Sequence, residues 1–170
     1  MSSLADSTIE TLQKIATELR PGILDNLGLA AAIEWQTEEF ASRTGIRCHL
    51  DCPEEIEGLD QAQATACFRI LQGTLTNVAR HANATEVRVR LQREANKLVL
   101  QIQDNGRGIP YSAITDPASI GLLGMRERAQ TLGGELNIIG IAGKGTSVTV
   151  SIPVASPAHR SERYENTDRR

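Results

Sequence analysis

Alternating apolar and polar residues mark four stretches of this chain as strands. In residues 85–92 every second side chain is apolar, and residues 97–104 repeat the pattern. A period of two is typical of a strand with one buried face. Because only residues 93–96 separate these stretches, we expect an antiparallel hairpin. Residues 134–141 and 146–152 predict a second hairpin.

A three- and four-residue apolar period marks other segments as helices. The predicted helices cover residues 7–19, 27–44, 60–81 and 123–132. Each has an apolar stripe of the kind that packs on a protein core. A short strand is expected at residues 46–51, between the second and third helices.

The order of these elements predicts a two-layer α/β sandwich of the α+β type. Hairpins link the later strands, which are therefore antiparallel, and helices separate the earlier ones. We expect a mixed, largely antiparallel sheet with helices on one face. The folded domain is predicted to span residues 22–154. A helix end and linker would occupy residues 1–21, and a polar, disordered tail would occupy residues 155–170.

Composition narrows the class of protein. The chain has 170 residues, of which 40% are hydrophobic and 23% charged, as in ordinary soluble domains. A net charge of -3 and 3% aromatic residues give no indication of a nucleic-acid partner. No apolar run reaches the roughly 18–20 residues needed to cross a bilayer. Cys48, Cys52 and Cys67 lack zinc-ligand spacing, so we expect free thiols in a reducing compartment.

A carboxylate and two glycines follow the predicted strand at residues 97–104. Asp104, Gly106 and Gly108 form the pattern D-x-G-x-G within the sequence D-N-G-R-G. Glycine lets a ligand approach the main chain closely. A fixed carboxylate beside such a backbone suits a flat ligand with an exocyclic amine, such as adenine. The same residues also form ordinary turns, so the motif alone leaves both interpretations open.

Two other segments carry residue types suited to phosphate. Gly121 and Gly124 open the helix predicted at residues 123–132, where free amide groups favour phosphate. They could equally be turn and cap residues.

The end of the long predicted helix carries three polar residues on one face. Asn77, Arg80 and His81 stand at positions i, i+3 and i+4. An asparagine amide oxygen can bind Mg²⁺, which keeps waters and phosphate oxygens as its other ligands. Arg80 can neutralise phosphate charge. Arg80 and His81 could also be present only because cations are favourable at a helix C-terminus.

Together these motifs resemble those of the GHKL (Bergerat-fold) ATPases, which include gyrase, Hsp90, MutL and histidine kinases. The matching positions follow the order of the N, G1 and G2 boxes: Asn77, Asp104, Gly106, Gly108, Gly121, Gly124, Gly145 and Thr146. Four longer segments resemble one subfamily of these ATPases more specifically. The segments at residues 19–21 (L-R-P), 27–33 (L-G-L-A-A-A-I), 75–82 (L-T-N-V-A-R-H-A) and 121–129 (G-L-L-G-M-R-E-R-A) resemble nitrate-sensor-like bacterial sensor histidine kinases.

The resemblance implies a site for ATP and Mg²⁺. On the base side, Asp104 would accept a hydrogen bond from the adenine amino group. Gly106 and Gly108 would shape the adenine pocket, and Thr146 would lie near the same base.

On the phosphate side, the resemblance implies that Asn77 binds Mg²⁺ and that Arg80 and His81 contact phosphate or ribose. A mobile lid and its hinge would be formed by Gly121, Leu123, Gly124 and Met125.

The resemblance further implies a protein-histidine kinase. In this family the γ-phosphoryl group of ATP passes to a histidine on a dimeric helical hairpin, and then to an aspartate of a response regulator. The full-length protein would be a homodimer, cytoplasmic or the cytoplasmic part of a membrane-anchored sensor. None of His49, His81 and His159 occupies the acceptor position, so residues 1–21 would be the end of the dimerisation helix. We expect this chain not to autophosphorylate alone.

Gly73 departs from the subfamily pattern. Four residues before the Mg²⁺-binding asparagine the subfamily usually has Glu or Asn, and a carboxylate there could polarise the attacking group. Gly73 cannot do this, so we hypothesise that nucleotide binding survives while phosphotransfer is weak. The alternatives at this position are an engineered or degenerate domain, or a base supplied by the missing helix. For the function of the chain, the alternatives are a nucleotide-binding regulatory module with weak or no phosphotransfer, and an anti-sigma-type serine kinase on the same fold.

Overall fold

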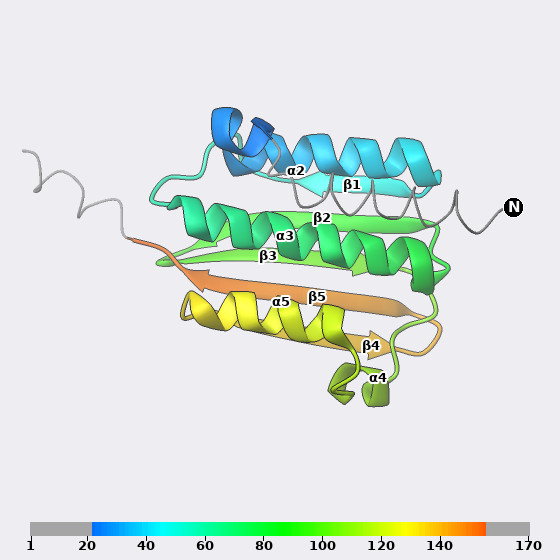
Figure 1. Cartoon of the computed structure of the whole chain (residues 1–170). Coiled ribbons are helices and arrows are strands. Elements are labelled where there is room, and N and C mark those ends of the chain that lie inside the picture. The colour runs from blue at the N-terminus through cyan, green and yellow to red at the C-terminus, as the bar shows by residue number, and fades with distance from the viewer. Residues whose placement is uncertain (1–21, 156–170) are drawn as a thin grey trace, which may run out of the picture.

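The computed structural model describes residues 22–155, which form a two-layer sandwich with helices packed on one face of a five-stranded sheet (Figure 1). This confirms the expected fold class. The helices are α2 (Gly22–Thr44), α3 (Gln61–Asn77), the π-helix η1 (Val78–Ala82), α4 (Tyr111–Thr115) and α5 (Ile120–Thr131). The strands are β1 (Arg47–Asp51), β2 (Glu86–Glu94), β3 (Lys97–Asp104), β4 (Glu135–Ile141) and β5 (Gly145–Pro153).

The strand order is β1-β2-β3-β5-β4. β1 runs parallel to β2, and all other neighbours are antiparallel. In the register between β3 and β5, Ile102 pairs with Val148 and Gln103 with Ser147. The last residue of β3, Asp104, therefore lies at the same end of the sheet as Thr146.

The core lies between the sheet and its helices. On β3, Leu98, Leu100 and Ile102 are buried beneath the helical layer, and the alternation predicted from the sequence is confirmed. On α3, Phe68 and Leu71 are fully buried. Burying one such side chain contributes roughly 1.5–3 kcal/mol, so α3 is held firmly on the sheet.

The second predicted helix is longer than its apolar pattern indicates. It was expected over residues 27–44, but α2 begins at Gly22 and is kinked at Gly28 (φ 82, ψ -178). Only glycine adopts such angles at no steric cost. The periodic pattern therefore identifies the part of the helix that follows the kink.

The third predicted helix changes its geometry near its end. Asp60 caps α3, since its Oδ1 accepts from the Gln63 amide (2.8 Å) while the Gln63 side chain accepts from the Asp60 amide (2.8 Å). The predicted single helix over residues 60–81 is wrong at its C-terminal end, where η1 begins at Val78. A π-helix bonds i to i+5 rather than i to i+4, so the α-helical spacing that predicted one face for Asn77, Arg80 and His81 does not apply beyond Val78.

Residues 106–121, where the sequence predicts neither a helix nor a strand, contain a short helix. This helix, α4, lies beside β4 (Figure 1), and α5 begins at Ile120 rather than at the predicted Leu123. The predictions for residues 1–21 and for nearly all of the tail lie outside the described residues. Among residues 22–155, no helix is long and apolar enough to cross a membrane.

Candidate functional site

A cavity of about 590 Å³ opens at the end of the sheet where β3 stops and β5 starts. Its volume is in the range of cavities that hold small ligands and cofactors. Six residues predicted from the sequence line it: Asn77, His81, Asp104, Gly108, Gly121 and Thr146. The structure therefore brings together three motifs that are far apart in the chain.

One side of the cavity, which we call the strand wall, consists of residues 104–109 and 146–148. Asp104 is 5% exposed, and its Oδ1 accepts a hydrogen bond of 2.8 Å from the Gly106 amide. Thr146 Oγ1 accepts from the Ile109 amide (3.1 Å). These bonds fix the carboxylate and the turn that follows it.

Close backbone contacts explain the two glycines of the strand wall. A Cβ atom on Gly106 would lie 2.2 Å from the carbonyl oxygen of Ala82. A Cβ atom on Gly108 (φ 78) would lie 2.3 Å from the carbonyl oxygen of Ile141. Gly108 lines the cavity, whereas Gly106 packs behind it. Glycine at these positions allows the turn to fit between η1 and β4.

The second side is formed by the end of α3 and by η1. Asn77 is half-buried, His81 is exposed, and both line the cavity. Arg80 is exposed and is not among the lining residues. Of the three residues predicted on one helix face, the structure therefore brings Asn77 and His81 to the cavity and leaves Arg80 outside its lining.

The third side, the helical wall, consists of residues 110–122. Gly121 lines the cavity in the first turn of α5, where a Cβ atom would meet nothing within 4 Å. Leu123, Gly124 and Met125 were also predicted for the site, but they are not among the lining residues. Leu123 is partly exposed, and Met125 is 3% exposed and packs on α3 instead.

Met125 fills the space beside Gly73. A Cβ atom on Gly73 would lie 2.7 Å from Met125 Cε. The Thr74 hydroxyl donates to the Ile70 carbonyl oxygen (2.8 Å) and lies 3.8 Å from Met125 Sδ. A side chain larger than hydrogen at position 73 therefore requires Met125 to move. The contact joins α5, which carries part of the helical wall, to α3, which carries Asn77.

Sequence reasoning missed several residues of the cavity. Arg107 lies between the two glycines of the D-x-G-x-G pattern and is a cation at the cavity. Ile138 and Val148 add apolar surface, and their alternating positions on β4 and β5 are the signal that could have identified them. Ser119, just before α5, also lines the cavity, but no motif marks it.

The three thiols lie outside the cavity. Cys48, Cys52 and Cys67 are free, as expected. Burial raises the pKa of Cys52 to about 11, helped by the nearby carboxylates of Glu34 and Asp51, and burial raises the pKa of Cys67 to about 12. These thiols are therefore protonated at neutral pH, which is typical of structural cysteines.

Residues 62–156 match the family described as histidine kinase-, DNA gyrase B-, and HSP90-like ATPase. Since the match spans more than half of the chain, the protein belongs to this family. Membership of this family implies that the domain binds ATP. The cavity holds a buried carboxylate together with residues of three converging motifs.

Comparison with individual proteins agrees with this assignment. The chain is 31% identical over 146 residues to the oxygen sensor histidine kinase NreB of Staphylococcus carnosus. The aligned residues make up 86% of this chain and 42% of that protein. The histidine kinase domain of a blue-light activated histidine kinase from Erythrobacter litoralis superposes with a TM-score of 0.60 at 24% identity, covering 74% of this chain and 61% of that chain. The histidine kinase AdeS of Acinetobacter baumannii gives a TM-score of 0.60 at 15% identity, covering 92% and 86%. At these identities the two structures establish the fold alone.

Proposed function

We propose that this chain is the catalytic domain of a two-component sensor histidine kinase. It would deliver the γ-phosphoryl group of ATP to a histidine on a dimerisation helix, from which the group passes to a response regulator. The observation that carries the proposal is the buried carboxylate of Asp104 facing one cavity with Asn77 and His81. The identity to a sensor histidine kinase supports it.

The strand wall would select the base. Because the Gly106 amide occupies Oδ1 of Asp104, the other carboxylate oxygen can accept from the exocyclic amine of adenine. Ile138 and Val148 offer apolar surface to the flat faces of the ring. A buried carboxylate that needs a donor discriminates against bases that lack one, since it would otherwise remain unpaired.

The wall formed by α3 and η1 would hold the phosphates. Asn77 supplies an amide oxygen suited to Mg²⁺, whose other ligands would be phosphate oxygens and water. Bound Mg²⁺ neutralises phosphate charge. His81 and Arg107 line the same cavity and can contact ribose or phosphate. Positioning and charge neutralisation are the main requirements of phosphoryl transfer.

We also propose the partners and the cellular compartment of this domain. The acceptor would be a helical hairpin of the same protein, which would be a homodimer. We place the domain in the cytoplasm, where ATP is available and where free thiols such as Cys67 persist.

A second candidate is a nucleotide-binding regulatory module with weak or no phosphotransfer. Gly73 favours it, because no carboxylate stands one turn before Asn77 and Met125 fills the space. The two candidates share ATP binding and differ only in transfer to an acceptor histidine.

Calorimetric titration with ATP and ADP, with and without Mg²⁺, tests the site first. We expect saturable binding by the wild type and a loss of at least about tenfold in affinity for Asp104→Asn. Asn has one acceptor oxygen and a donor NH2 group, so it cannot offer one oxygen to the Gly106 amide and the other to the adenine amine as a carboxylate does. Asp51→Asn is the matched control, because Asp51 lies on β1 and pairs with Arg90 outside the cavity. Equal affinity for Asp104→Asn and wild type would refute the base-binding role.

Incubation with labelled ATP and a separately supplied acceptor hairpin then tests the reaction. Acid-labile label on the hairpin histidine would support the kinase. Binding without transfer would support the regulatory module. Acid-stable label on serine of a protein substrate would support the anti-sigma-type kinase instead.

A further inference from the structure

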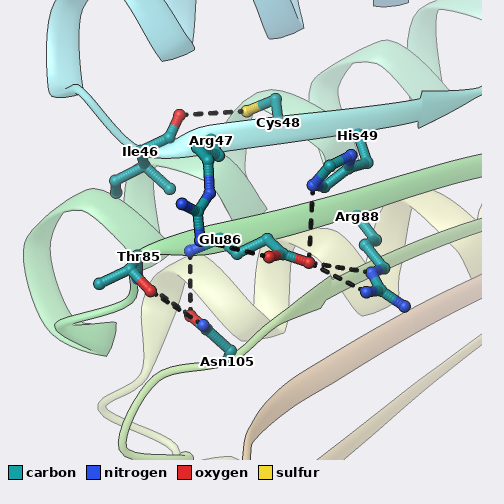
Figure 2. A network of polar contacts seen from close by, with 8 residues as sticks. All are labelled: Ile46, Arg47, Cys48, His49, Thr85, Glu86, Arg88 and Asn105. Atoms are coloured by element: carbon teal, nitrogen blue, oxygen red, sulfur yellow. Dashed lines mark hydrogen bonds and ion pairs between the residues drawn. The ribbon is translucent and has the colours of Figure 1, made fainter.

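Asn105 follows the base-binding carboxylate directly but is not among the residues that line the cavity. Its side chain reaches the start of β2 (Figure 2). Asn105 Oδ1 accepts from the amides of Thr85 (2.9 Å) and Glu86 (3.0 Å), and Nδ2 donates to Thr85 Oγ1 (2.9 Å). One side chain therefore makes three hydrogen bonds to two consecutive residues.

Backbone bonds extend this connection on both sides. The Asn105 amide donates to the Glu86 carbonyl oxygen (3.2 Å), and the Arg107 amide donates to the Ala82 carbonyl oxygen (2.8 Å). Gly106, between them, lies directly against Ala82, because a Cβ atom on Gly106 would lie 2.2 Å from the Ala82 carbonyl oxygen. Residues 105–107 are thus fastened along residues 82–86.

Each of the two fastened segments continues into one side of the nucleotide cavity. Residues 105–107 include Gly106, whose amide holds Oδ1 of Asp104. Residues 82–86 begin at the last residue of η1, and η1 is preceded by Asn77 and contains His81. The bonds of Asn105 therefore set the spacing between the carboxylate for the base and the residues for the phosphates.

We propose that Asn105 is a positioning residue of the nucleotide site. It acts through Asp104 and the segment that follows η1, without touching the ligand. The inference rests on the proposed use of this cavity for ATP. Its chemical requirement is an acceptor oxygen at position 105 that binds two adjacent amides at once.

The charged cluster around Glu86 provides a matched control. Glu86 pairs with Arg88 (3.1 Å), His49 (3.6 Å) and Arg47 (3.7 Å) on the exposed face of β1 and β2 (Figure 2). Arg88 belongs to the same network but bonds only the Glu86 carboxylate among the residues drawn. Arg88→Ala thus disturbs the network while leaving the acceptor at position 105 in place.

The test compares ADP affinity in the full chain for wild type, Asn105→Ala, Asn105→Asp and Arg88→Ala, at a temperature where each is folded. We expect Asn105→Ala to lose roughly tenfold in affinity. Asn105→Asp retains an acceptor for both amides and should bind within about threefold of wild type. Measurement at two salt concentrations corrects for its added charge, because exposed charges are screened. Arg88→Ala should bind like wild type.

Ile33→Val, in the core of α2, controls for general loss of stability. Wild-type affinity in Asn105→Ala would overturn the inference, and so would an equal loss in Asn105→Asp or in Ile33→Val. No ADP binding by the wild type would instead refute the proposed function itself, so the two failures are distinguishable.

Discussion

The strand wall and the helical wall close the same cavity by different means. The strand wall is fixed by contacts between main-chain atoms, such as those of Gly106 with Ala82 and of Gly108 with Ile141. The helical wall is built from short helices that expose apolar side chains, with Tyr111 79% and Ile120 78% exposed. Its internal bonds are local, for example from Ser119 Oγ to the Ala113 carbonyl oxygen (2.8 Å).

This difference indicates that the strand wall is the more rigid of the two walls. Main-chain contacts leave little freedom, so the strand wall can present its carboxylate in one orientation. Local bonds and exposed side chains are typical of segments that open at low cost in free energy. We therefore expect substitutions in the strand wall to be costly and substitutions in the helical wall to be tolerated.

The largest effect is expected for Gly106→Ala in the strand wall. A Cβ atom 2.2 Å from a backbone oxygen requires the turn to move away from η1. Overpacking commonly costs about 1–3 kcal/mol, and we expect at least about 3 kcal/mol here because the contact is with main chain. Urea denaturation measures the loss, and ATP titration should detect no binding. A loss of less than about 0.5 kcal/mol in the free energy of unfolding would show that the strand wall is not the more constrained of the two walls.

The contact between Gly73 and Met125 joins α3 to α5, whose first residues belong to the helical wall. Gly73→Glu alone should destabilise the fold by about 1 kcal/mol, the low end of the range for overpacking, because only the flexible end of the buried Met125 side chain must move. Phosphotransfer to a supplied acceptor hairpin should rise only when Gly73→Glu is combined with Met125→Ala, which makes room for the carboxylate.

A double-mutant cycle on urea midpoints checks this contact. The coupling between Gly73→Ala and Met125→Ala should be about 0.5–3 kcal/mol, as for residues in contact. Strict additivity, or a gain in transfer by Gly73→Glu alone, would contradict the contact. Gly124→Ala is a suitable control, since its Cβ would meet only the end of the Arg128 side chain (3.1 Å).

A pH effect probes the core beneath α3. Burial raises the pKa of Cys67 to about 12 from 9.0, so the folded state favours the neutral thiol. The resulting stabilisation is complete below about pH 9 and is lost as pH rises toward 12. Between pH 9 and pH 10 wild type should lose roughly 1 kcal/mol more than Cys67→Ala. If the free energies of unfolding of the two proteins fell in parallel with pH, burial would not raise the pKa of Cys67.

The smallest effect is expected for Gly121→Ala in the helical wall. Its Cβ would meet nothing within 4 Å, and alanine is favoured over glycine in a helix by about 1 kcal/mol. The melting temperature should therefore rise slightly. A destabilisation comparable to that of Gly106→Ala would show that the two walls are equally constrained.

The two walls also differ in how well the sequence predicts them. Strict alternation identified β3 from Lys97 to Asp104 with correct bounds, and D-x-G-x-G marked its end. The exposed residues around α4 have no apolar period, so this helix was missed. The π-helix was missed because the apolar stripe that precedes it has the same three- and four-residue steps as in a continuous α-helix, so the pattern gives no sign of the wider turn. Arg80, which was predicted to contact phosphate or ribose, does not line the cavity, whereas Arg107, which was not predicted, does.

The pairing of β3 with β5 has a consequence for how the protein folds. Each of the hairpins β2–β3 and β4–β5 joins residues that are close in sequence, whereas β3 pairs with β5 over a long separation, as in Gln103 with Ser147. Local contacts form before distant ones because closing a long loop costs more entropy. Asp104 belongs to one hairpin and Thr146 to the other, so the cavity that we propose as the nucleotide site is assembled only when the hairpins dock. A nucleotide that binds the docked state should hold the two halves together, which amide hydrogen exchange along β3 and β5 would register as slower opening.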